Sequence, residues 1–151
     1  MLVRSPVLAD TEDQAWAKAD HIVAQAVALR ERGGSGRSPN NARQNRPDGV
    51  GPANEGSRRL LDAAAKGRRL DKRLWTGIAA LTGAQGNSTG LVGTPDQVAD
   101  AMLDYYDLGI TTFLVRGFDP LVDAIQYGRE LLPRVRALIE AREAGQAVAA
   151  E

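Results

Sequence analysis

The sequence is poor in the residues that build disulfides and metal centres. Its 151 residues include no cysteine and one histidine, which excludes disulfides, thiolate metal sites and multi-histidine centres. Basic and acidic side chains number 19 each, so no net field favours nucleic acid or an anionic membrane. No apolar run approaches the roughly 20 residues that cross a bilayer, and the first residues carry no signal peptide. We therefore expect a cytoplasmic protein that binds no nucleic acid, membrane or metal.

The chain also lacks common catalytic motifs. It has no P-loop, no dinucleotide-binding glycine fingerprint, and no Ser–His–Asp or paired-carboxylate pattern. Its length suits one domain, but a full (β/α)₈ barrel needs roughly 250 residues. What the sequence does contain is an alternation of strand-like and helix-like segments, which predicts an α/β fold with parallel strands.

Two capping boxes predict the starts of helices. Thr11 and Gln14 open the first, which should end before the glycine pair that begins at Gly33. Thr94 and Gln97 open the second, with a proline at its first helical position and a glycine at 109 to end it.

Apolar runs predict the strands. The run at 74–81 is short and bounded by turn residues, and 110–115 is rich in β-branched residues. The first segment, 2–8, is a poor central strand because Pro6 cannot donate to a ladder. We expect a glycine-rich loop at 82–90.

The remaining segments complete the predicted domain, which spans residues 1–144. Helices are expected at 57–68 and 121–144, the second kinked near Pro133. Residues 33–56 are rich in Gly, Pro, Asn and Ser and predict a long flexible loop. Residues 145–151 are expected to form a disordered tail.

The candidate site residues follow the predicted strands, where parallel βα folds collect function. Arg116 is the best candidate for binding an anion, although the residues alone favour a structural role, in which it caps a carbonyl or pairs with Asp119. Glycines of the 82–90 loop could bring backbone N–H groups close to a phosphate, or the loop could be a plain connector.

Other conspicuous residues have structural interpretations. His21 lies beside a helical apolar stripe with no acidic or thiol partners, which favours a structural or solvent-facing role. Trp16 and Trp75 are interpreted as core residues. The basic run at 66–73 includes Asp71 and no aromatic residue, so a solvated helix end is preferred over a nucleic-acid site.

The stretch LVGTPDQVADAMLDYYDLGITTFLVRGFDPLVDAIQYGRELLPRVR (91–136) resembles the C-terminal end of luciferase-like flavin-dependent monooxygenases, in particular the alkanesulfonate monooxygenase branch. The resemblance extends to LWTGIAAL and TGAQGNSTG (74–90) and to DTEDQAWAKAD (10–20). It implies the C-terminal part of a (β/α)₈ TIM barrel, with 111–115 as its final strand and the first half missing.

The resemblance also implies partners and ligands. The family uses reduced FMN, which a flavin reductase supplies, to oxidise a substrate such as an alkanesulfonate. It assigns substrate binding to Arg116, Thr82 and Phe118, and cofactor binding to Gly83, Gly86 and Gly117. No catalytic residue is assigned.

Departures from the family pattern point to an incomplete site. Ser5 stands near the position of a strand histidine, Thr82 nearest a loop arginine, and Phe118 at that of a tyrosine. The flavin-phosphate contacts belong mainly to the missing half. The chain is therefore expected to be inactive alone and to pair with that half or with a second copy; the alternative is a non-catalytic half-barrel.

Overall fold

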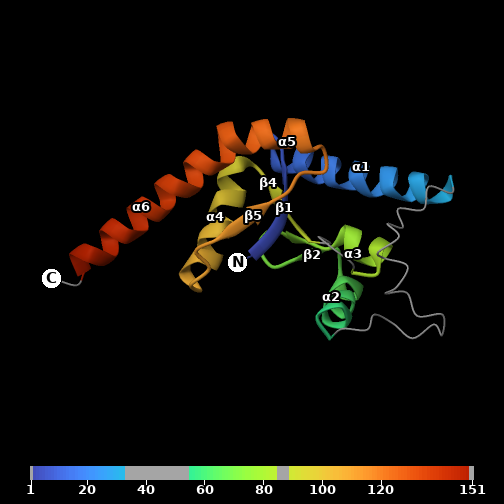
Figure 1. Ribbon diagram of the computed structural model, residues 1–151, viewed down its shortest axis with the longest axis horizontal. Helices are drawn as coiled ribbons and strands as arrows, with labels where there is room; N and C mark the ends of the chain where they lie inside the picture. Colours follow the sequence, from blue (N-terminus) through green and yellow to red (C-terminus); the bar gives the residue numbers. More distant parts are fainter. Residues whose placement is uncertain (1, 33–54, 85–88, 150–151) are drawn as a thin grey trace.

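The computed structural model describes residues 2–32, 55–84 and 89–149, and it shows a mixed α/β fold built on one five-stranded sheet (Figure 1). Three strands run parallel, and a short hairpin is added antiparallel at one side. The spatial order is β2 (Arg69–Leu70), β3 (Leu74–Trp75), β4 (Gly90–Gly93), β1 (Leu2–Leu8) and β5 (Phe113–Val115).

Helices lie on both faces of the sheet, and the two longest reach toward opposite ends of the molecule (Figure 1). The predicted helix starts are confirmed, and the full capping box forms at the second of them. The Thr11 hydroxyl accepts from the Gln14 N–H, and Thr94 and Gln97 form a reciprocal box. Gly109 follows the second helix with φ +87°. The helices are α1 (Glu12–Glu31), α2 (Glu55–Lys66), α3 (Gly77–Thr82), α4 (Pro95–Asp107), α5 (Pro120–Gln126), the π-helical turn η1 (Tyr127–Leu131) and α6 (Leu132–Ala149).

The core has two parts, one on each face of the sheet. Leu91 packs under α4, η1 and α6, whereas its neighbour Val92 packs under α1 with Trp75. Successive strand residues point to opposite faces, so β4 is buried at all four positions. The sheet is therefore a filled middle layer between two helical layers.

The predicted strand at 74–81 was wrong beyond Trp75. Thr76 breaks the run, and residues 77–82 form α3. A side chain at Gly77 would lie 2.5 Å from Trp75 Nε1, so glycine lets the chain fold back over the indole. A short apolar run does not distinguish strand from helix by periodicity.

Two strand assignments also changed. β4 was missed because its two glycines resemble the loop before it. Pro6 lies in the central strand, contrary to expectation. Ser5 N–H points to β4, so the missing donor of Pro6 faces the other side, where β5 has already ended at Val115. The carbonyl of Pro6 accepts the Tyr127 hydroxyl at 2.5 Å.

The strand order differs from that of successive barrel strands. In a (β/α)₈ barrel each strand lies beside the next. Here β5 lies beside β1, and the β2–β3 hairpin occupies the far side of β4. The two parallel crossovers thus run in opposite directions, which places α1 and α4 on opposite faces.

The helix predicted at 121–144 was expected to kink near Pro133, and it is interrupted about one turn before that proline. The π-helical turn η1 ends at Leu131, immediately before the turn that contains Pro133. Proline removes an N–H donor, and a local π turn is one way a helix accommodates such a gap. α6 then continues to Ala149, so 145–149, expected to be tail, are helical. Of the predicted loop, 33–54 lie outside the described residues, and the rest begins α2.

Candidate functional site

The carboxyl ends of β1, β4 and β5 meet at one edge of the sheet because the three strands are parallel. Function gathers at this edge in βα folds. The chain leaves it through three segments: the start of α1, the start of α4, and the turn at 116–119 between β5 and α5. The last of these holds three of the predicted site residues.

The β5–α5 turn is built around one buried carboxylate. Asp123 is 3% exposed, and its Oδ2 accepts from the backbone N–H groups of Phe118 at 2.8 Å and Asp119 at 3.0 Å. Its Oδ1 pairs with Lys18 Nζ of α1 at 3.2 Å. A Cβ at Gly117 would lie 2.6 Å from Asp123 Oδ2, so glycine is needed for this close approach. The structure thus gives Gly117 a packing role at the turn.

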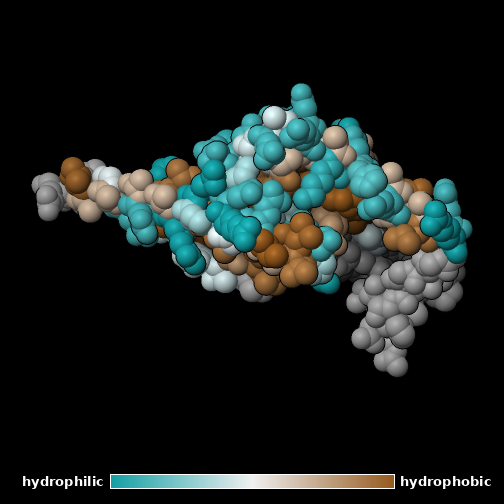
Figure 2. Space-filling view, turned by 90° about the horizontal axis from the view of Figure 1, so that it is seen from above, coloured by the Kyte–Doolittle hydropathy of each residue, from teal (hydrophilic) through white to brown (hydrophobic). Residues whose placement is uncertain are grey.

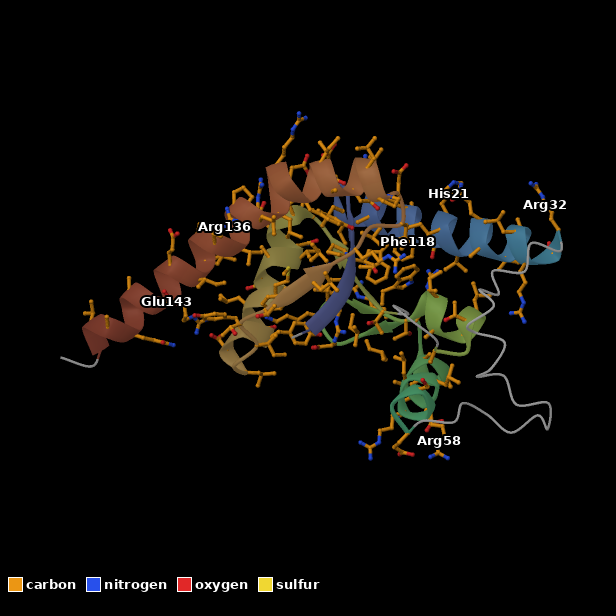
Figure 3. All side chains as sticks on the ribbon, viewed as in Figure 1. His21, Arg32, Arg58, Phe118, Arg136 and Glu143 are labelled. Atoms are coloured by element: carbon orange, nitrogen blue, oxygen red, sulfur yellow. The ribbon has the colours of Figure 1, made fainter. Side chains whose placement is uncertain are left out.

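Phe118 turns back across the sheet and meets Trp75 edge to face, with ring centroids 5.8 Å apart. Figure 3 labels Phe118 beside the start of α1, whereas His21 points outward from that helix. Trp75 is 1% exposed, which confirms that it is a core residue and leaves no ring face open for a flavin. Phe118 keeps about a third of its surface exposed, at 38%.

Arg116 lies on the exposed side of the same turn. Its backbone N–H donates to the Arg4 carbonyl at 3.1 Å, which extends the pairing of β5 with β1 by one bond. Within the described ranges its side chain forms no ion pair with Asp119. Instead, Asp119 caps α5 by accepting from the Val122 N–H at 3.2 Å. The Arg116 guanidinium is therefore available to an anion at the strand ends.

Thr82 and Gly83 lie elsewhere. The Thr82 hydroxyl donates to the Ile78 carbonyl at 3.0 Å, and Gly83 ends α3 with φ +62°. Two side chains of α1 contact the two regions. Lys18 pairs with Asp123 of the β5–α5 segment, whereas Arg30 donates to the Leu81 carbonyl in α3. Lys18 and Arg30 are twelve residues apart, so their Cα atoms are separated by about 18 Å along the helix axis.

The structure therefore divides the predicted site residues into two groups. Arg116, Gly117 and Phe118 come together at the strand ends, and Thr82 and Gly83 lie near the far end of α1. Gly86 lies outside the described residues.

Sequence reasoning missed a charged cluster at the same edge. Glu12 accepts from Gln97 Nε2 at 3.0 Å and pairs with Arg73 at 2.8 Å and with Arg69 at 3.0 Å. The hydrogen bond from Arg73, with help from Gln97 and Trp16, holds the pKa of Glu12 at about 2. The first turn of α1 is thus tied to the start of α4 and to the β2–β3 hairpin.

The interpretation of the basic run 66–73 as a solvated helix end was wrong from residue 68 onward. After Lys66, which ends α2, the run enters the β2–β3 hairpin, and four of its basic side chains pair with acidic groups of the same chain. The pairs are Arg68–Asp20, Arg69–Glu12, Arg73–Glu12 and Lys72 with Asp100 and Asp104.

Two hollows lie among the described residues. The larger hollow, of about 330 Å³, lies between α1, α2 and α3, near the lower limit for ligand pockets, and its one cation, Arg68, is paired with Asp20. The smaller hollow is about 70 Å³. Neither offers an unpaired cation for the flavin phosphate together with an open aromatic face. Among the described residues no group of three side chains could hold a metal.

Residues 1–112 match the luciferase-like monooxygenase family. The match covers well over half of the chain, which therefore belongs to this family. Family members generally use reduced flavin to carry out monooxygenation, so the chain is of the oxidoreductase class. The five-stranded mixed sheet is consistent with part of a luciferase-like barrel. None of the described helices is both long and apolar enough to cross a membrane.

Proposed function

We propose that this protein is part of an FMN-dependent monooxygenase that acts on a small anion of the alkanesulfonate class. The observation that carries this proposal is the position of Arg116 and Phe118, on one anchored turn at the carboxyl edge of the parallel strands. A guanidinium can bind a sulfonate through two parallel hydrogen bonds, and the partly exposed ring can cover an alkyl chain. A flavin reductase would supply reduced FMN, and the lack of cysteine suits a cytoplasmic location.

The flavin site would be completed by strands from another chain. Among the described strands, β5 pairs with β1 alone, and apolar side chains are exposed on β5 and on the segment that follows it. Figure 2, which looks down on the side where α5 lies, shows hydrophobic surface exposed among polar side chains. Among the described residues, five large apolar side chains of β5, the turn after it and α5 are exposed: Leu114, Phe118, Leu121, Val122 and Ile125. We propose that a chain that supplies the rest of the barrel adds here, so the protein is inactive alone. A second copy is the other candidate partner.

The experiment measures sulfonate and FMN binding separately. Calorimetric titration of the full chain with 1-octanesulfonate should show binding that Arg116→Ala abolishes. Arg136→Ala is the matched control, because Arg136 lies on the outer side of α6, away from the turn (Figure 3). Equal binding by wild type and Arg116→Ala would contradict the anion assignment. FMN fluorescence should not be quenched tightly by the chain alone, and tight quenching would contradict the incomplete site.

The free edge of β5 also favours a second candidate, a non-catalytic half-barrel that only pairs with another chain. It predicts a stable complex with a barrel half, with neither sulfonate binding nor sulfite release when NADPH, FMN and a flavin reductase are added. Sulfite release by the complex would exclude it.

A further inference from the structure

We propose that Asp123 is a positioning residue, which fixes the β5–α5 turn and thereby sets the direction from which Arg116 and Phe118 meet a ligand. The inference rests on the proposed function only for the identity of that ligand. The residue lies at the fourth position of α5, and no sequence pattern marks it.

Asp123 has more hydrogen bonds than helix capping requires. Asp119 already caps α5 through the Val122 N–H. The Asp123 carboxylate instead reaches back to the N–H groups of residues 118 and 119 and across to Lys18. Bonds to a carboxylate are stronger than neutral ones, and a charge this buried is retained only when paired. Its partners therefore hold the turn against both α5 and α1.

Arg116 and Phe118 are each held by a backbone hydrogen bond to another part of the fold. On one side, the Arg116 N–H is bonded to the Arg4 carbonyl of β1. On the other, the Phe118 N–H is bonded to Asp123, and the Phe118 ring packs against Trp75. Gly117 between them has no room for a side chain because Asp123 fills that space. The backbone that carries Arg116 can thus change direction only if the Asp123 bonds break.

The first test reads the turn itself and requires no ligand. The chain contains two phenylalanines, Phe113 and Phe118, so fluorophenylalanine labelling in a Phe113→Leu background gives one ¹⁹F resonance. In wild type the Trp75 ring should shift this resonance from its unfolded position. Asp123→Ala should move it toward the unfolded position while circular dichroism still shows a folded chain. Asp119→Ala is the matched control, since it removes a carboxylate from the same turn but leaves the Asp123 bonds.

The outcomes separate the inference from a general loss of stability. A Phe118 resonance unmoved by Asp123→Ala, or moved equally by Asp119→Ala, overturns it. If Asp123→Ala does not fold, hydrogen exchange of the wild-type chain decides. The amides of residues 118 and 119 should be strongly protected as donors to a buried carboxylate, and exchange at unfolded rates overturns the inference.

The second test connects the turn to binding. Asp123→Ala should weaken 1-octanesulfonate binding at least tenfold, and Asp123→Asn, which keeps an oxygen acceptor for both N–H groups, should restore most of it. Binding unchanged in Asp123→Ala contradicts the positioning role. If wild type binds no sulfonate, the proposed function fails, whereas the ¹⁹F and exchange results still decide the role of Asp123.

Discussion

The two outermost strands of the sheet, β2 and β5, form lateral edges that differ in length, in charge and in the exposure of apolar side chains. At one edge, which we term the covered edge, β2 is two residues long and the hairpin carries four basic side chains that pair with α1 and α4. At the other, the open edge, no strand of the described part of the chain pairs with β5 on the side away from β1, and Leu114 is half exposed. Short, charged outer strands resist pairing with other chains, whereas bare apolar ones invite it. This difference is the reason for proposing the open edge as the place where another chain adds.

The largest effect is expected at the covered edge. Trp75→Ala removes a side chain that is 1% exposed and should lower the free energy of unfolding by about 3–5 kcal/mol. Leu121, near the open edge, is 72% exposed, so Leu121→Ala should change it by less than about 0.5 kcal/mol. Urea denaturation followed by circular dichroism measures both. Similar losses for the two variants would show that the edges are equally packed.

The next effect concerns association. Leu114→Lys places a charge on the open edge and should abolish binding of a complementary barrel half, or dimerisation, while leaving the melting temperature nearly unchanged. Sedimentation velocity gives the association state, and Lys72→Leu on the hairpin serves as the mirror-image control. Association that survives Leu114→Lys would place the interface elsewhere.

A smaller, pH-dependent effect belongs to the cluster that holds the hairpin. The pKa of Glu12 is about 2 in the folded chain and 4.5 ordinarily, so the folded state favours its charged form. This contribution is complete above pH about 4.5 and is lost as the pH falls toward 2. The melting temperature of Glu12→Gln should therefore fall less steeply than that of wild type across this range. Parallel curves would show that Glu12 does not secure the hairpin.

The smallest effect is expected from the exposed pairs of Lys72 with Asp100 and Asp104. Lys72→Met should lower the melting temperature slightly at low salt, because exposed pairs contribute little and are screened by ions. The difference from wild type should vanish in 1 M sodium chloride. A difference that persists at high salt would mean that the Lys72 stem, rather than its charge, packs against α4.

Local sequence chemistry predicted the elements that depend on local bonds. The boxes at Thr11 and Thr94 and the glycine at 109 define α1 and α4 because capping involves residues three or four apart. The strand order was not predictable in this way. β4 is marked only by Leu91 and Val92 between two glycines, and a proline at position 6 is tolerated only because β5 stops before it.

The site shows the same division. The rule that function lies at strand ends drew attention to Arg116 and Phe118, and the structure places both on the turn after β5, whereas their binding roles stay predictions. It could not show that Thr82 lies near the opposite end of α1 from the turn, since that depends on the unexpected helix α3. Asp123 was missed because an aspartate in a first helical turn is common, and only the tertiary structure shows that it is buried.

The two-residue strand β2 has a consequence for the behaviour of the chain at high concentration. If both outermost strands of a sheet can pair with another chain, each copy can bind two others and the assembly can grow without limit. This sheet has one such strand, so strand pairing between copies stops after a single addition. Edge-to-edge association of the folded chain should therefore end at a pair instead of growing into a fibre.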